Sequence, residues 1–184
     1  MEWEFTVLNQ IQQIRTDFLD KLMPCITFLG QWAILWIVIT ILCIAFKQKR
    51  KLGISLAFNI VINTIACNLI FKSIVQRLRP YVLNESFTLI IPPEKDFFSF
   101  PSGHSMFAFG AATIIFIYNK KIGICMYLLA AMIAFSRLYL YMHFPTDVMI
   151  GSLMGIILAV FSYKIEKHLL VKPNIRKVTY SPHL

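Results

Sequence analysis

Charged side chains are scarce in this chain: they make up 15% of its 184 residues, while 58% are hydrophobic and the mean hydropathy is +0.67. Those values exclude an ordinary soluble domain, in which about a quarter of the residues are charged. The sequence also lacks a Pro-, Gly- or Ser-rich linker, an internal repeat and a low-complexity tract. We therefore predict one compact integral membrane domain.

Several kinds of site and signal are missing as well. The four cysteines stand singly in apolar runs, without C-x-x-C spacing or a neighbouring histidine, which is typical of buried thiols and predicts no metal site. The N-terminus is acidic where a signal peptide would be basic, so we expect no cleaved signal. The formal net charge is +9, but in an apolar chain a basic excess is more typical of cytoplasmic loops than of nucleic-acid binding.

What the chain does contain is a succession of apolar segments. Residues 1–24 alternate apolar and polar positions at helical spacing, which predicts an amphipathic helix in the membrane interface or, alternatively, a helix that binds a partner. Uncharged or nearly uncharged runs follow at 25–46, 52–71, 101–118, 122–136 and 148–163. A helix needs roughly 20 residues to cross a bilayer. We predict an all-α polytopic transmembrane helical bundle of about five spans.

The predicted membrane domain covers residues 25–163, and a basic tail covers 164–184. Within the fifth span, Gly151-x-x-x-Gly155 predicts close packing against another helix. Two basic turns, at residues 47–51 and 119–121, separate apolar runs. If the first span runs inward, eleven of the eighteen basic residues and one of the nine acidic residues fall on the side of these turns and the tail. That bias predicts a cytoplasmic location for this side in the plasma membrane. The opposite, extracytoplasmic face then receives Lys72, Arg79, Ser102, His104, Arg137, His143 and Asp147.

Three segments at that face carry anion-binding groups. Lys72 and Arg79 are seven residues apart, about two helical turns, so we expect both on one side of an extension of the second span. Pro101-Ser102-Gly103 offers a hydroxyl and backbone N–H groups at a helix start. Arg137 adds a planar guanidinium suited to phosphate oxygens. The pattern predicts a phosphate site, which residues 80–99 could cover.

Two histidines accompany the cations, and phosphoryl transfer can use one group as a nucleophile and another as an acid. Asp147 follows His143 by four residues, with Pro145 opening a helix between them. It is placed to bind the far ring nitrogen of His143 and to stabilise the charged imidazole, which leaves His104 for the acid. Any one of these residues could instead be an interfacial anchor or a packed side chain, but their gathering at one membrane face favours a functional site.

Lys72-x6-Arg79-Pro80, Pro101-Ser102-Gly103-His104 and Ser136-Arg137-x5-His143-x3-Asp147 together resemble the three-part signature of the type 2 phosphatidic acid phosphatase superfamily, over residues 72–147. The resemblance implies a metal-independent, cofactor-free phosphatase with a phosphohistidine intermediate. One departure is the number of spans, since many bacterial members have six. The resemblance assigns His143 as the nucleophile, Asp147 as its orienting partner, His104 as the general acid, and Lys72, Arg79, Ser102, Gly103 and Arg137 as phosphate-binding residues.

Within the superfamily, Ser-Gly-His followed by His143-Phe-Pro-Thr-Asp147 is similar to the phosphatidylglycerophosphate phosphatase B type. The bacitracin-resistance type of undecaprenyl diphosphate phosphatase more often has an aspartate where Gly103 stands. The implied substrate is a lipid phosphate: phosphatidylglycerophosphate, phosphatidate or a polyprenyl diphosphate. Two alternatives remain open, a lipid phosphotransferase that uses the same histidine and a non-catalytic membrane protein that binds or flips lipid head groups. The sequence predicts no particular oligomeric state.

Overall fold

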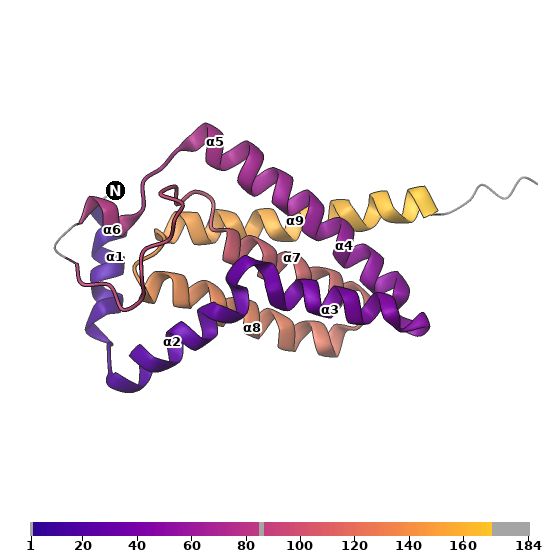
Figure 1. Ribbon diagram of the computed structural model, residues 1–184, viewed down its shortest axis with the longest axis horizontal. Helices are drawn as coiled ribbons and strands as arrows, with labels where there is room; N and C mark the ends of the chain where they lie inside the picture. The colour runs from indigo at the N-terminus through magenta and orange to yellow at the C-terminus, as the bar shows by residue number, and fades with distance from the viewer. Residues whose placement is uncertain (1, 85–86, 171–184) are drawn as a thin grey trace, which may run out of the picture.

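The computed structural model of the chain describes residues 2–84 and 87–170, and that part is mostly helical (Figure 1). Its β structure is confined, within those residues, to an isolated bridge between Leu78 and Phe98. The predicted all-α class is confirmed. The helices are α1 (Glu2–Gln13), α2 (Asp17–Gly30), the short 3-10 helix η1 (Gln31–Ala33), α3 (Ile34–Ala45), the 3-10 helix η2 (Lys47–Lys49), α4 (Arg50–Thr64), the π-helix η3 (Ile65–Phe71), α5 (Lys72–Val75), α6 (Pro80–Leu83), α7 (Gly103–Tyr118), α8 (Lys120–Tyr139) and α9 (Pro145–Leu170).

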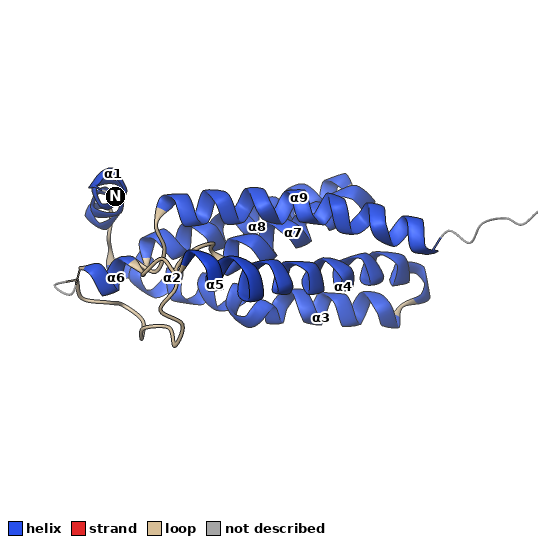
Figure 2. Ribbon diagram, turned by 90° about the horizontal axis from the view of Figure 1, so that it is seen from above, coloured by secondary structure: helices blue, strands red, loops and turns tan. Residues whose placement is uncertain are grey.

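Helix α7 is the centre of the bundle and packs against α4, α8 and α9. Figure 2 shows α3 and α4 side by side along one flank, with α8 and α9 on the other. Small side chains on α7 make this packing possible: Ala108, Ala111 and Ala112 are at most 1% exposed. Because alanine keeps the backbone close to the helix surface, neighbouring helices can approach closely without leaving voids.

Two glycines of α9 permit the contact with α7. A Cβ on Gly151 would lie 2.6 Å from the carbonyl oxygen of Ser102, and one on Gly155 would lie 2.3 Å from the carbonyl oxygen of Met106. Both distances are far inside van der Waals contact, and both neighbours are backbone atoms. The close packing predicted from Gly151-x-x-x-Gly155 is therefore confirmed.

Each of the five predicted apolar segments is helical, although they differ in length. Lys47–Val75, Lys120–Tyr139 and Pro145–His168 are long and apolar enough to cross a membrane. Helices α2 and α3 are bent by 46° relative to each other and would together make a fourth span. Helix α7 has 16 residues and is shorter than a full span. By length and composition, the described residues thus supply three or four complete spans where the sequence predicted about five.

The N-terminal segment differs from the single helix predicted over residues 1–24. Helix α1 ends at Gln13, and α2 begins at Asp17 after a turn. The reason is local: Thr16 has extended backbone angles, and its hydroxyl accepts a hydrogen bond from the amide of Leu19, which caps a new helix. Helix α1 then lies across the end of the bundle (Figure 1), where Leu8 is fully buried against Tyr141 and Phe144.

The segment after the second span also differs from prediction. The helix that contains Lys72 ends at Val75, and Gln76 follows in the left-handed region with φ 46°. Arg79 stands in extended backbone before Pro80, as the ring of a following proline requires. The expectation that Lys72 and Arg79 share a helix extension is therefore wrong. Lys72 and Arg79 still lie at the same end of the bundle, because the segment before Arg79 pairs with residues 98–99. There the amide of Ser99 donates to the carbonyl of Arg77 at 2.7 Å.

The two ends of the bundle have different chemistry. The turns around Lys47–Lys49 and Asn119 and the C-terminal end of α9 lie at one end, and the loops around residues 76–102 and 140–144 lie at the other (Figure 1). This is the separation that the charge pattern predicted. Helix α9 continues to Leu170, so the first seven residues of the predicted tail belong to it, and the remainder of that tail lies outside the described residues.

Candidate active site

The residues predicted to form a site meet at the end of the bundle that α1 crosses. Short segments between or at the ends of helices supply them, which lets side chains far apart in sequence converge. They comprise Lys72 at the start of α5, Arg79 in the following loop, Ser102, Gly103 and His104 at the start of α7, Arg137 in the last turn of α8, His143 between α8 and α9, and Asp147 in the first turn of α9.

Carboxylates of the loop before α7 pair with the three predicted phosphate-binding cations. Lys72 Nζ lies 2.5 Å from Asp96 Oδ2. Glu94 bridges two arginines: one oxygen lies 2.7 Å from Arg79 Nη2, and the other contacts Arg137 Nη2. The loop therefore covers the site and places anionic oxygens on each cation.

The two arginines are buried donors aimed into the site. Arg79 is 1% exposed, and its Nη1 donates to the carbonyl of Met142 at 3.1 Å. Arg137 Nη1 donates to Thr27 Oγ1 at 2.7 Å, but its buried Nε has no partner among the described residues. Buried guanidinium N–H groups nearly always have an acceptor. The free Nε of Arg137 therefore marks unused capacity to bind an anion.

Electrostatics keep the loop carboxylates charged. Burial raises the pKa of Glu94, but the neighbouring Arg137 and Arg79 outweigh it and bring the pKa below its ordinary value. Burial opposes ionisation of Asp96 too, and the hydrogen bond from Lys72 reverses it, so the pKa of this carboxyl is also lowered. Both groups are therefore anions near neutral pH.

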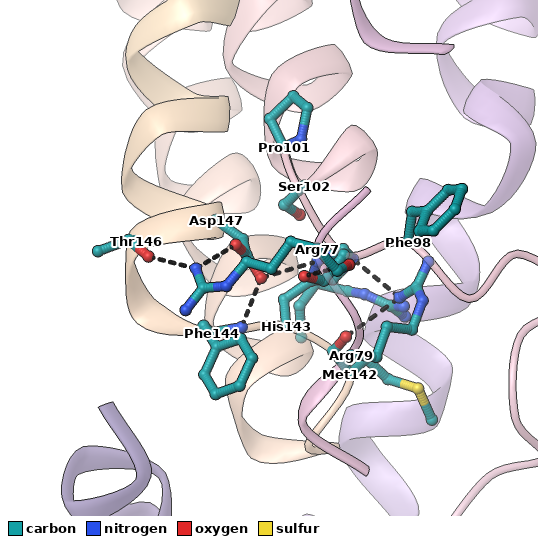
Figure 3. Close-up of polar contacts among 12 residues, drawn as sticks. Arg77, Arg79, Phe98, Pro101, Ser102, Met142, His143, Phe144, Thr146 and Asp147 are labelled. Atoms are coloured by element: carbon teal, nitrogen blue, oxygen red, sulfur yellow. Dashed lines mark hydrogen bonds and ion pairs between the residues drawn. The ribbon is translucent and has the colours of Figure 1, made fainter. Parts of the chain in front are cut away.

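His143 lies between Arg79 and Asp147 (Figure 3). Its Nε2 is 3.2 Å from Arg79 Nη1, and because a guanidinium can only donate, Nε2 must accept. The ring proton is then on Nδ1, 3.7 Å from Asp147 Oδ2, so the carboxylate faces this nitrogen but does not make the predicted bond to it. Burial, followed by repulsion from Arg79 and Arg137, lowers the pKa of His143 well below its ordinary value of about 6.5. The ring is thus neutral near pH 7, with its Nε2 lone pair directed at Arg79.

Asp147 is held from two directions and is fully buried. Its Oδ2 accepts the amide N–H of Phe144 at 2.8 Å, and its Oδ1 accepts from Arg77 Nη1 at 2.7 Å. Pro145 is the first residue of α9 and Asp147 the third, so the carboxylate reaches back to the residue before the helix, as in a capping box. The same side chain that caps α9 faces the ring of His143.

In the described part of the chain, Ser102 and His104 do not hydrogen-bond to the loop carboxylates that pair with the cations. Ser102 caps α7 by accepting from the amide of Ser105 at 3.4 Å, while its own amide donates to the carbonyl of Asp147 at 3.0 Å. This bond ties the start of α7 to the start of α9. His104 makes no hydrogen bond or ion pair within the described residues, and its ring packs against Gly30, where an added Cβ would lie 2.8 Å from Cδ2. Gly103 likewise makes no direct polar contact with the other predicted site residues in the described chain.

Sequence reasoning missed three residues at the site: Glu4, Arg77 and Thr146. Arg77 contacts Asp147, Thr146 and Glu4, the last two at 2.7 and 2.5 Å through Nη1 and Nη2. Its position inside Lys72-x6-Arg79 was the available signal. Glu4 gave none, because its partners are 73 and 142 residues away. The described residues contain no group of three His, Cys, Asp or Glu side chains that could hold a metal ion.

Comparison with known proteins agrees with the family resemblance found in the sequence. Residues 49–169 match the PAP2 superfamily. The undecaprenyl-diphosphatase of Sulfolobus acidocaldarius is 32% identical over 88% of this chain and 76% of its own length. Phosphatidylglycerophosphatase B of Bacillus subtilis is 31% identical over 79% of this chain and 74% of its own. The crystal structure of Aquifex aeolicus LpxE superposes with a TM-score of 0.71 at 28% identity, over 87% of this chain and 94% of that one.

Proposed function

This chain belongs to the PAP2 superfamily of membrane lipid phosphatases, and we propose that it hydrolyses the terminal phosphate of a lipid phosphate through a phosphohistidine formed on His143. The observation that carries the proposal is the orientation of that ring. Its Nε2 lone pair points at Arg79 within a cluster of three cations, and its Nδ1 faces Asp147. A phosphoryl group bound by the cations would lie in front of this lone pair.

In the first step, Nε2 of His143 attacks the terminal phosphorus as the bond from phosphorus to the leaving oxygen breaks. Lys72, Arg79 and Arg137 neutralise the charge that spreads over the three equatorial oxygens. Each cation must first exchange its loop carboxylate for a phosphate oxygen. Ser102 and Gly103 are proposed as further ligands from the start of α7.

His104 acts as the acid that protonates the leaving oxygen. In the second step it takes a proton from water, whose oxygen bonds to phosphorus while the phosphorus–nitrogen bond breaks. Inorganic phosphate leaves, and the neutral ring of His143 returns. The unbonded ring nitrogens of His104 are free to serve a substrate, since they have no polar partner in the described chain.

The proposed substrates are lipids whose phosphate reaches the end of the bundle that carries the site, while their chains stay in the bilayer. A polyprenyl diphosphate is the first to test, followed by phosphatidylglycerophosphate and phosphatidate, because the relatives' names include an undecaprenyl-diphosphatase and a phosphatidylglycerophosphatase. We place the site on the extracytoplasmic face of the plasma membrane, since the basic turns lie at the opposite end of the bundle.

Phosphate release from these three lipids, measured with purified protein in excess chelator, tests the proposal. Wild type should release phosphate from at least one lipid, and His143→Ala should release none above background. His168→Ala is the matched control, since this exposed histidine lies in the last turn of α9, at the far end of the bundle. Equal rates for His143→Ala and wild type would refute the assignment of the nucleophile.

The same assay separates the two alternatives. A phosphotransferase would release free phosphate only when an acceptor lipid is present, whereas a hydrolase needs water alone. A lipid-binding protein would bind the substrates in vesicles and release phosphate from none of them. A 32P-labelled terminal phosphate that remains on wild-type protein after acid-free denaturation, and is absent from His143→Ala, would identify the covalent intermediate.

A further inference from the structure

We infer that Arg77 and Glu4 are positioning residues, which hold Asp147 charged and aimed at His143 rather than bind phosphate. The inference rests on the proposed function and adds two residues to it. It also makes the N-terminal helix α1 part of the active site, because Glu4 belongs to that helix.

The contacts of Arg77 converge on the carboxylate behind the histidine (Figure 3). Its Nη1 donates to Asp147 Oδ1 and to Thr146 Oγ1, both at 2.7 Å. The guanidinium carbon lies 4.0 Å from the centre of the Phe144 ring. A planar group fixed on one face by an aromatic ring and on its edge by two oxygens has little freedom to turn elsewhere.

Glu4 fixes the other side of the guanidinium. Its Oε2 lies 2.5 Å from Arg77 Nη2, and its Oε1 accepts from Thr146 Oγ1 at 2.6 Å. The side chain is 5% exposed, and the packing of Leu8 against Phe144 holds its helix in place. Glu4, Arg77 and Thr146 thus form a closed ring of contacts around the first turn of α9.

The charge around Arg77 argues against a role in phosphate binding. Two buried carboxylates, those of Glu4 and Asp147, face this one cation, so the group as a whole is negative. A phosphate would be repelled there. A positive charge on His143 would be stabilised, and such a charge develops when Nε2 bonds to phosphorus while the proton stays on Nδ1.

Arg77 also determines where that proton stays. If Asp147 took the Nδ1 proton, the phosphorylated ring would become neutral and would leave phosphorus less readily when water attacks. The guanidinium at Oδ1 stabilises the carboxylate as an anion, so the proton remains on the ring. Loss of Arg77 should therefore slow turnover and leave substrate binding nearly unchanged.

The test compares Arg77→Gln, Arg77→Lys, Asp147→Asn and the double variant Arg77→Gln/Asp147→Asn. We expect Arg77→Gln to lower kcat about 10- to 100-fold with KM changed less than about threefold, and Arg77→Lys to recover part of that loss. In the Asp147→Asn background, Arg77→Gln should change kcat less than about threefold, because the residue acts through Asp147. A rise in KM at unchanged kcat, or additive losses in the double variant, would overturn the inference.

Glu4→Gln should lower kcat by a smaller factor, about three- to tenfold, since Arg77 keeps its bonds to α9. Arg15→Gln is the matched control: Arg15 pairs with Asp20 at 2.7 Å in the neighbouring turn and touches no site residue. Equal kcat for Glu4→Gln and Arg15→Gln would remove Glu4 from the assignment.

A measurement that needs no turnover separates failure of this inference from failure of the proposed function. In 13C-aspartate NMR of the solubilised protein, with the signal assigned from Asp147→Asn, the carboxyl of Asp147 should be ionised at pH 7 in wild type, and Arg77→Gln should raise its protonated fraction. An unchanged protonated fraction would refute the role of Arg77 even if no lipid were hydrolysed. Should Arg77→Gln fail to fold, Arg77→Lys gives a weaker change in the same direction, because it keeps the charge but loses the fork that joins Asp147 to Glu4.

Discussion

Two pairs of acidic side chains face the cations of this site, and the fold holds them very differently. Glu94 and Asp96 come from the loop before α7, and their side chains are 30% and 42% exposed. Glu4 and Asp147 come from α1 and α9 and are 5% and 0% exposed. The loop pair can move away from its cations, whereas the helix pair is locked by packing and hydrogen bonds.

This difference in burial suggests that carboxylates serve two purposes at the site. A carboxylate that bridges two arginines presents two anionic oxygens, as a phosphate does, so Glu94 occupies the place that we propose for substrate. The buried carboxylate of Asp147, behind His143, is held by Arg77 and by the amide of Phe144, and we propose that it acts on the charge of the ring. Substitutions on the two sides should therefore change different kinetic constants.

The largest effect is expected for the buried helix pair, Glu4 and Asp147. Asp147→Asn should lower kcat about 10³- to 10⁴-fold with little change in KM, because the ring of His143 loses both its orientation and the partner for its positive charge. Asp20→Asn, which removes a carboxylate from the half-buried pair with Arg15 and from its bond with Tyr139, should leave kcat within about twofold. Steady-state kinetics decides; a raised KM at unchanged kcat for Asp147→Asn would contradict the comparison.

On the exchangeable side, Arg137→Gln should lower kcat/KM about 100-fold, mainly through KM. The substitution removes a buried charge that is proposed to bind phosphate oxygens and leaves part of Glu94 unpaired. Thr27→Val removes only the contact that orients Arg137 and should cost less than about tenfold. If the two variants had equal kcat/KM, orientation rather than charge would be the contribution of Arg137.

Removal of the exchangeable carboxylate should act in the opposite direction. Glu94→Gln is expected to lower KM about three- to tenfold, because phosphate no longer competes with an anion for Arg79 and Arg137. The melting temperature of the free protein should fall by a few degrees, since two buried cations lose their counter-charge, and orthovanadate should restore it. Asp96→Asn should lower KM and the melting temperature in the same way, but by smaller amounts. An increase in KM for Glu94→Gln would show that this carboxylate helps substrate rather than competes with it.

The smallest effect concerns pH. Burial and the charges of Arg79, Arg137 and Lys72 lower the pKa of His143, while Glu94 partly offsets them. The nucleophile therefore stays neutral as pH falls through 6.5, and the acidic limb of kcat/KM should lie below about pH 6.5. In Glu94→Gln the limb should move further toward acid, because the ring loses a stabilising anion for its protonated form. A limb at or above pH 7 in wild type would contradict this environment.

Local patterns in the sequence determined a large part of the molecule. The apolar runs predicted five helical segments, and Gly151-x-x-x-Gly155 predicted the close contact of α9 with another helix, because side-chain volume and helical period act over neighbouring residues. The four-residue spacing of His143 and Asp147 predicted a bond between them. The local, proline-opened turn does bring the two groups face to face, but Nδ1 and Oδ2 are 3.7 Å apart and make no hydrogen bond.

Where prediction failed, the cause was a break that competes with periodicity. Thr16 starts a new helix inside an amphipathic pattern, and the left-handed residue Gln76 ends the helix of Lys72 before Arg79. Pro80 was a usable signal for the second break, because the residue before proline favours extended backbone. Gln76 gave no such signal, because glycine rather than glutamine is the usual residue in the left-handed conformation.

Which charges meet depends on tertiary packing. The contacts of Arg77 with Asp147 and Glu4 join residues 70 and 73 positions apart, and the contact of Glu94 with Arg137 joins residues 43 positions apart. No period or spacing encodes such pairs, because they depend on how α1 crosses the bundle and how the loop before α7 folds over it. Local sequence patterns were therefore enough to predict a helical membrane protein with a histidine and an aspartate beside a cluster of cations. Packing set which carboxylates are fully buried and which stay partly exposed, and we propose that a phosphate replaces the partly exposed ones.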